Sequence, residues 1–177
     1  MAVAPARYRV QTRRWTRAEY DRMILRGVLD EDEPLELLDG RLVVREPESA
    51  SHNAAIWLVQ NALRRAFGHG WLVRGPAPVA LDPASEPAPD LTVVRGSPRD
   101  YTRDHPARPA LVVEVARTSL AKDRRMKSGL YARAGIADYW VVNLVDRVLE
   151  VYRDPVRRAS ARYGWKYDRI RVADLLP

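Results

Sequence analysis

Apolar residues recur at three- and four-residue spacing in three segments of the chain, which is the period of an amphipathic helix. The first segment opens with Thr16 and Glu19, which have the spacing of a capping box. The second and third segments end at Gly68 and Gly135, and glycine is the residue that most often terminates a helix. We therefore predict helices over 16–24, 51–67 and 120–134.

Strands are predicted where β-branched and other apolar residues form short runs. Asp39 and Gly40 separate two such runs and form the dipeptide that a tight type I′ turn prefers, so we expect a β-hairpin over 35–44. The run 110–116 is almost wholly apolar, which is typical of a central strand buried on both faces. Further strands are expected over 71–74, 79–81, 90–94, 138–143, 148–153 and 165–172, the last at an edge.

The domain organisation follows from the length of 177 residues, which is that of one domain with one sizeable core. We expect a flexible N-terminal arm over 1–14, which carries four arginines, and a single domain over 15–177. A proline-rich loop is expected over 82–89. A long polar loop is expected over 96–109, and loops of this length often carry function.

Several functional classes are excluded by what the sequence lacks. There is no cysteine, so disulfides, zinc thiolate sites and thiol nucleophiles are excluded. No apolar run approaches the roughly 20 residues that cross a bilayer, and residues 1–14 lack the apolar stretch of a secretory signal. We therefore expect a cytoplasmic protein with no membrane contact.

The formal net charge is +7, and all but three of the 30 basic residues are arginine. This composition suits a phosphate-rich partner such as DNA, because the guanidinium group binds phosphate through two hydrogen bonds. A coding bias toward certain codons would produce the same excess of arginine without any partner.

Glu114 is the most informative single residue because it interrupts an apolar strand. A buried carboxylate destabilises the fold unless a cation faces it, and that cation could be an arginine or a metal ion. Asp90 favours the metal, because it begins another predicted strand and two converging carboxylates repel each other unless a divalent cation or a shared proton lies between them. Alone, an aspartate after Pro89 is more typical of a loop cap.

Lys127 lies on the apolar stripe of the third predicted helix, although lysine is rare in this chain. A compact ammonium group can approach a phosphate or a water where a guanidinium group does not fit. The alternative is an ion pair between Lys127 and Asp123, four residues earlier on the same helix.

Glu36 and His52 are weaker candidates for the same site. Glu36 lies in the predicted hairpin and is either a metal ligand or an outward-facing strand acid. His52 lies at the start of the second helix, where it either contacts substrate and orients a water or simply satisfies the helix terminus. His69 and His105 form no ligand spacing with it, which argues against a histidine-based zinc site.

These residues form a pattern along most of the chain. It consists of Pro89 and Asp90, the run Val113, Glu114, Val115 and Ala116, then Asp123, Lys127, Tyr131, Gly135, Tyr139 and Trp140. This pattern resembles the Uma-two family of putative restriction endonucleases, within the PD-(D/E)XK nuclease superfamily. The resemblance extends from the hairpin at residue 35 to about residue 152.

The resemblance implies an α/β (α+β) fold with a restriction-endonuclease-like core, in which a mixed central β-sheet is flanked by helices. It also implies that Asp90, Glu114 and the backbone carbonyl of Val115 hold Mg²⁺, with Mn²⁺ as a possible substitute. Glu36 matches the acidic residue that many superfamily members place before the core.

This chain departs from the superfamily pattern near the glutamate. The superfamily's lysine normally lies two residues after the glutamate, where this chain has Ala116, and Lys127 on the next helix could place its ammonium group in the same space. Arg117 and Asn143 stand where a small polar residue and an acid are expected.

The predicted function is a Mg²⁺-dependent endonuclease that hydrolyses DNA phosphodiester bonds, with Lys127 positioning a water or stabilising the developing charge. Arg99, Arg103 and Arg108 in the long loop are predicted to clamp the DNA backbone, or else are solvated loop arginines. A homodimer would bring two sites to the two strands. The alternatives are a nucleic-acid-binding protein that has lost cleavage and a non-enzymatic interaction domain.

Overall fold

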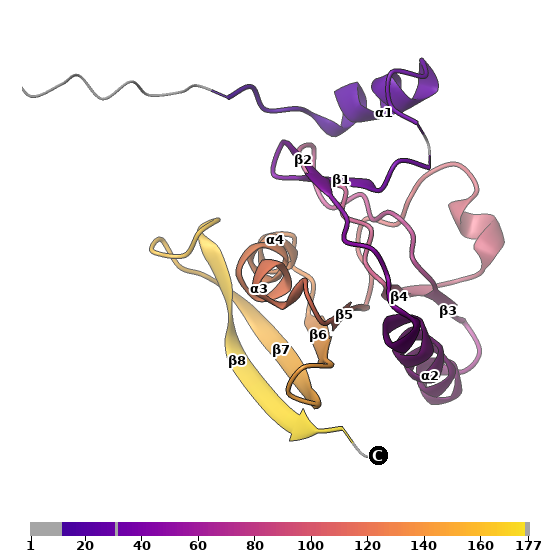
Figure 1. The fold of residues 1–177 in the computed structure, drawn as a ribbon, viewed down its shortest axis with the longest axis vertical. Helices are drawn as coiled ribbons and strands as arrows, with labels where there is room; N and C mark the ends of the chain where they lie inside the picture. The colour runs from indigo at the N-terminus through magenta and orange to yellow at the C-terminus, as the bar shows by residue number, and fades with distance from the viewer. Residues whose placement is uncertain (1–11, 31, 176–177) are drawn as a thin grey trace, which may run out of the picture.

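The computed structural model describes residues 12–30 and 32–175, and Figure 1 shows its arrangement. Six strands form one mixed sheet in the order β3, β4, β5, β6, β7, β8, and β1 and β2 form a separate hairpin. This confirms the predicted mixed central sheet flanked by helices. The elements are α1 (Arg17–Leu25), β1 (Leu35–Leu38), β2 (Arg41–Val44), α2 (Ala50–Phe67), β3 (Trp71–Arg74), β4 (Leu91–Arg95), the 3₁₀ helix η1 (Pro98–Tyr101), β5 (Leu111–Ala116), α3 (Leu120–Lys122), the π-helical η2 (Asp123–Lys127), α4 (Ser128–Arg133), β6 (Asp138–Asn143), β7 (Val148–Arg157) and β8 (Trp165–Asp174).

Strands β5 and β6 are parallel, whereas the other neighbours in the six-stranded sheet are antiparallel. A parallel pair needs a long crossover connection, because the chain must return to the end of the sheet at which the first strand began. The continuous helical segment α3, η2 and α4 provides it. The crossover begins just beyond the carboxyl end of β5, so the residues that follow Glu114 lead directly into this helix.

The two faces of the sheet are covered by different helices. Successive side chains of a strand point to opposite faces, so neighbouring residues of β5 belong to different cores. Val113 and Val115 belong to the apolar core that includes residues of α2. Val112 and Ala116 belong to the core that includes residues of α4. Glu114 alternates with Val113 and Val115, so its side chain points to the face covered by the crossover helix.

The hairpin turn has the predicted type I′ conformation, with positive φ at both Asp39 (50°) and Gly40 (75°). Gly40 also packs closely against the chain before α1, since a Cβ atom there would lie 2.8 Å from Cβ of Arg14. The Arg14 guanidinium pairs with the Asp39 carboxylate. Most of the predicted arm, residues 1–11, lies outside the described residues, and its end at Arg14 is attached to the hairpin.

Arg133 at the end of α4 joins the hairpin to the crossover helix. Its guanidinium donates to the Asp39 carboxylate at 2.8 Å and to the Asp82 carboxylate in the proline-rich loop, also at 2.8 Å. Such charge-assisted bonds to two separate segments restrict the position of both. The arrangement fixes the hairpin, and with it Glu36, relative to the helix that carries Lys127.

The predicted strand over 79–81 is wrong. Val79 and Ala80 donate their backbone N–H groups to the carbonyls of Pro87 and Pro106, which lie in loops. Proline has no N–H group to return such a bond, so no strand ladder forms here. The last two strands are longer than predicted, and Val156 and Arg157, which lie beyond the strand predicted over 148–153, pair with β8.

Candidate active site

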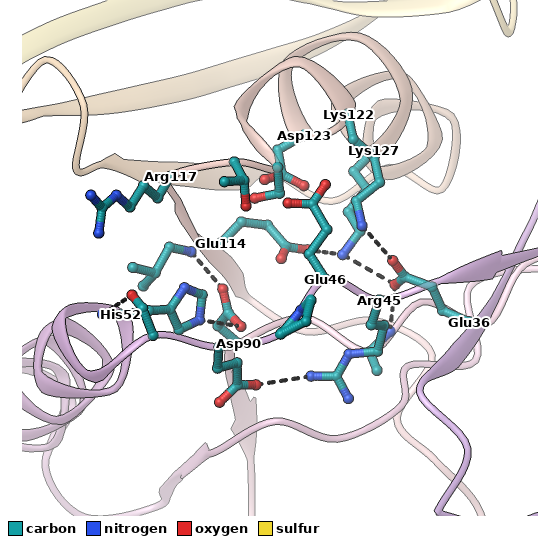
Figure 2. A pocket seen from close by; sticks show the side chains of 17 residues that line it. Glu36, Arg45, Glu46, His52, Asp90, Glu114, Arg117, Lys122, Asp123 and Lys127 are labelled. Atoms are coloured by element: carbon teal, nitrogen blue, oxygen red, sulfur yellow. Dashed lines mark hydrogen bonds and ion pairs between the residues drawn. The ribbon is translucent and has the colours of Figure 1, made fainter.

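A pocket of about 300 Å³ opens at the carboxyl end of β5, between the first hairpin, the start of α2 and the crossover helix. Figure 2 shows its lining side chains. The sequence-predicted residues Glu36, His52, Asp90, Glu114 and Lys127 all line it. Five residues from five separate segments of the chain are therefore brought together in one place. The other lining residues are Arg45, Glu46, Pro47, Glu48, Ser49, Ala88, Val115, Arg117, Thr118, Ser119, Lys122 and Asp123.

Asp90 directly precedes β4 and is held in place by the neighbouring strand. Leu91 pairs with Val113 in the antiparallel register, which places Asp90 next to Glu114 at the end of the ladder. One carboxylate oxygen of Asp90 accepts a hydrogen bond of 2.6 Å from the backbone N–H of Val115. This short bond to the backbone fixes the orientation of the carboxylate.

Glu114 is buried beneath the crossover helix, as its place in an apolar strand predicts. Its Oε1 accepts hydrogen bonds from the Lys127 ammonium group at 3.0 Å and from the Tyr131 hydroxyl at 2.8 Å. The facing cation is thus a lysine, and the alternative of an arginine partner is wrong. Because both donors come from one rigid helical segment, the Glu114 side chain has a defined position.

Lys127 points into the protein and is only 4 % exposed. Besides Glu114, its Nζ lies 3.1 Å from Oε2 of Glu36 (Figure 2). The predicted alternative of an Asp123 and Lys127 pair is not formed among the described residues, because Lys127 is taken by the two glutamates. Glu36 is likewise buried, which excludes its interpretation as an outward-facing acid.

The pKa values of these buried groups are shifted in different directions. Burial raises the pKa of Glu114 well above its usual value; the charge of Lys127 opposes the rise and the charges of Asp123 and Asp90 add to it. Burial alone would also raise the pKa of Glu36, but the Lys127 and Lys122 ammonium groups outweigh it and hold the pKa below its usual value. Burial alone would lower the pKa of Lys127, but the surrounding carboxylates outweigh it and raise the pKa above its usual value, so this side chain stays protonated.

The buried part of the pocket contains more negative than positive charge. Four carboxylates, those of Glu36, Asp90, Glu114 and Asp123, are buried around the ammonium groups of Lys127 and Lys122. Four negative groups against two positive ones leave an excess of two negative charges when all are ionised and His52 is neutral. This excess equals the charge of one divalent cation.

A second arrangement of ligand atoms lies toward the outside of the pocket. His52 Nε2 is 3.2 Å from Oδ1 of Asp90. One ligand atom each from Glu48, His52 and Asp90 lie within 4.8 Å of one another. The two oxygens of Asp90 thus face different partners, the His52 ring on one side and the backbone of Val115 on the other.

In the metal-free protein, the hydrogen bond to Asp90 raises the pKa of His52 above its ordinary value of 6.5. The stabilisation from the charged pair is therefore complete below pH 6.5 and is lost as the pH rises through the folded-state pKa. We predict that NMR titration of the His52 ring gives a pKa above 6.5, and that Asp90→Asn lowers it. A wild-type pKa at or below 6.5 would contradict the geometry of this pair.

The three loop arginines predicted to bind DNA lie elsewhere. Arg99, Arg103 and Arg108 belong to the segment between β4 and β5, which leaves the carboxyl end of β4 and enters the amino end of β5. Asp90 lies at the opposite end of β4, about 16 Å away for five extended residues. None of the three lines the pocket. Their role in DNA binding stays a prediction, and it would have to be at a distance from the pocket.

Two positions that depart from the superfamily pattern have a structural explanation. Ala116 is completely buried on the face covered by the crossover helix, in one apolar cluster with Tyr131. Its small side chain leaves room for this helix to lie close to the strand and to present Lys127. Asn143 is also buried and donates to Asp146 and Glu150, so it serves the turn after β6.

Some residues of the pocket were not predicted as site residues from the sequence. Glu48 precedes α2 as one of several exposed acids, and no local pattern distinguishes it. In the sequence, Asp123 is a possible partner of Lys127 and a member of the family pattern, and its place on the apolar stripe is a signal of burial. Lys122 reaches Glu36 at 3.5 Å from the same helical segment.

A family model described as "Uma2: Putative restriction endonuclease" matches residues 17–175. The chain therefore belongs to this family, as its pattern of residues predicts. No curated protein matches the chain. Within the described residues, no helix is both long and apolar enough to cross a membrane.

One solved structure similar to this chain is described as a "putative nuclease belonging to DUF820" from Anabaena variabilis ATCC 29413. The two share 18% sequence identity with a TM-score of 0.57, over 84% of this chain and 81% of that chain. At this identity the likeness establishes a shared fold. The family, by its description, places the protein in the nuclease class, a class of hydrolases.

Proposed function

We propose that this protein is an endonuclease that hydrolyses DNA phosphodiester bonds with the help of a divalent cation, Mg²⁺ or Mn²⁺. The observation that carries the proposal is the contact between the Lys127 ammonium group and Glu114, next to Asp90, in an open pocket. Two acids at neighbouring strands, with a lysine from the crossover helix beside them, are groups that suit metal-assisted phosphodiester hydrolysis. The family description supports the same class of reaction.

The residues of the pocket fit a divalent cation. Asp90, Glu114 and the backbone carbonyl of Val115 are the proposed ligands, and carboxylate and carbonyl oxygens are those that Mg²⁺ and Mn²⁺ prefer. The excess of negative charge suits a cation in this pocket, and so does the buried Asp123 carboxylate, whose oxygens accept no regular hydrogen bond within the described residues. When bound, such a cation polarises the phosphate and lowers the pKa of a bound water.

The side chains of the pocket have separate roles in this proposal. Lys127 holds its protonated ammonium group beside Glu114, where it can donate to the negative charge that develops on the phosphate. Glu36 stabilises the charged form of Lys127 from the other side. Tyr131 and Lys127 both donate to Oε1 of Glu114, so Oε2 is the oxygen proposed to bind the cation.

DNA is the proposed substrate because the chain is strongly basic and arginines stand at the pocket. Arg117 lines the pocket and is exposed, so its guanidinium group can reach a phosphate in solution. Arg45 also lines the pocket but pairs with Glu48 at 3.3 Å. Contacts of this kind bind the DNA backbone without reading its sequence.

The second candidate is a nucleic-acid-binding domain of the same fold that has lost cleavage. It is motivated by Ala116, which occupies the usual position of the superfamily's lysine. The contact of Lys127 with Glu114 favours the enzyme, because an ammonium group is present at the glutamate although it comes from a different element. A homodimer, which would cut both strands, remains a prediction.

Cleavage of supercoiled plasmid DNA tests the proposal. We expect nicked and linear products when the purified protein is incubated with Mg²⁺ or Mn²⁺, and no products when EDTA is present. Salt-sensitive DNA binding without cleavage would support the inactive nucleic-acid-binding domain instead. Neither binding nor cleavage would contradict both, and would leave an interaction domain as the function.

A further inference from the structure

The carboxylate of Asp123 is buried in the pocket. The residue is 1 % exposed, and within the described part of the chain neither of its oxygens accepts a hydrogen bond of regular geometry, although the Ser119 side chain lies near enough to oppose the rise in its pKa that burial causes. An uncompensated buried carboxylate is strongly destabilising, so native proteins rarely retain one without a reason. Figure 2 shows Asp123 projecting from the helix toward the side of the pocket that holds Glu114.

The crossover helix changes its winding where Asp123 lies. Residues 123–127 form a π-helical turn between α3 and α4, and the backbone N–H of Ser128 donates to the carbonyl of Asp123. Single π turns inside helices are uncommon and occur frequently at functional sites. Here the turn begins with Asp123 and ends with Lys127, the two residues of this stretch that are buried.

The charge of Lys127 offsets part of the effect of burial on Asp123, but this lysine forms its hydrogen bond and ion pairs with other residues. The Lys127 ammonium group bonds with Glu114 and Glu36, at 3.0 and 3.1 Å. Lys122 faces Glu36. Asp123 is also close enough to Glu114 to raise its pKa, and its effect is larger than that of Asp90. Asp123, Glu114 and Asp90 therefore form a group of carboxylates that repel one another in a poorly solvated place.

We propose that Asp123 is a further ligand of the divalent cation, and that it completes with Glu114 and Asp90 a site of three carboxylates. This inference rests on the cation site of the proposed function and adds a ligand from the crossover helix. Three carboxylates make a hard, strongly negative site, which favours Mg²⁺ and Mn²⁺ over metals that prefer nitrogen or sulfur. The cation also removes the repulsion among the three acids.

A purely structural role for Asp123 gives the opposite effect on stability. If Asp123 mainly stabilised the charge of Lys127, Asp123→Asn would lower the melting temperature in the absence of a cation. If Asp123 is a ligand waiting for its cation, the neutral amide relieves repulsion, and the melting temperature in EDTA stays the same or rises. The sign of this change therefore separates the two roles.

The test uses calorimetric titration of the full chain with Mn²⁺ alone, without DNA. We expect Asp123→Asn to weaken Mn²⁺ binding at least tenfold and to remove most of the rise in melting temperature that Mn²⁺ causes in the wild type. Asp104→Asn, which removes the same charge from the exposed loop, should leave both unchanged. Asp123→Ala serves as a second variant if the amide does not fold.

Two results would overturn the inference: Mn²⁺ binding by Asp123→Asn equal to that of the wild type, or a lower melting temperature of this variant in EDTA. The outcome is separate from the test of the proposed function. A protein that binds Mn²⁺ through Asp123 but does not cut DNA supports the ligand and contradicts the nuclease. Cleavage by the wild type together with unchanged Mn²⁺ binding by the variant contradicts only the ligand.

Discussion

Replacing Lys127 with methionine is expected to lower the free energy of unfolding by about 3 to 5 kcal/mol, the cost of leaving buried charges without their partner. Methionine keeps most of the length and volume of the side chain but removes the charge. Glu36 and Glu114 would then be buried without the ammonium group that lies between them. Denaturation with urea in the presence of EDTA measures this change.

Two further variants show whether the lost charge is the cause. Lys166→Met changes a surface lysine whose partner, Asp168, is well exposed, so its effect should stay below about 1 kcal/mol. Combining Lys127→Met with Glu36→Gln and Glu114→Gln should recover much of the loss, because the uncompensated acids are removed. A loss below about 1 kcal/mol for Lys127→Met alone would mean that the buried ion pairs are not formed.

Asp90→Asn is expected to reduce Mg²⁺-dependent cleavage of plasmid DNA by about 100-fold or more. Removal of a residue that only supports a metal ligand typically lowers metal affinity or activity 10- to 100-fold. Asp90 is proposed as a direct ligand, so we expect a larger loss. The amide oxygen of asparagine can still accept the hydrogen bond from Val115, so the strand ends should stay in place.

The cleavage assay needs a control for charge and one for folding. Asp104→Asn removes one negative charge far from the pocket and should cleave like the wild type. Thermal unfolding of Asp90→Asn should remain cooperative. Full activity in a folded Asp90→Asn variant would show that this carboxylate is not part of the reaction.

The elements that could be predicted from the sequence are those set by local preferences. Asp39 and Gly40 specified the hairpin turn because both adopt positive φ there. The segment around Val79 was mistaken for a strand because its hydrogen-bond partners, Pro87 and Pro106, are remote in sequence. The π turn that begins at Asp123 also gives no signal in the apolar spacing, which is similar for α and π winding over one turn.

The same distinction applies to the site. Glu114 could be predicted because a single acid in an apolar strand is conspicuous, and Lys127 because it is a lysine on an apolar stripe. The second partner of Lys127 is Glu36, and this contact depends on where the hairpin packs against the crossover helix. That Asp123 accepts no regular hydrogen bond within the described residues depends on how several segments pack together, so it cannot be predicted from any one segment. In the sequence Glu48 is one exposed acid among many, and only the fold shows that it lies near His52 and Asp90.

The central claim is that the buried carboxylates beside Lys127 hold a divalent cation. Anomalous diffraction from a crystal soaked in Mn²⁺ tests it most directly. We predict one strong peak within ligand distance, about 2.0 to 2.6 Å, of oxygens from both Asp90 and Glu114. A Mn²⁺-saturated crystal with no anomalous peak near either carboxylate would contradict the account.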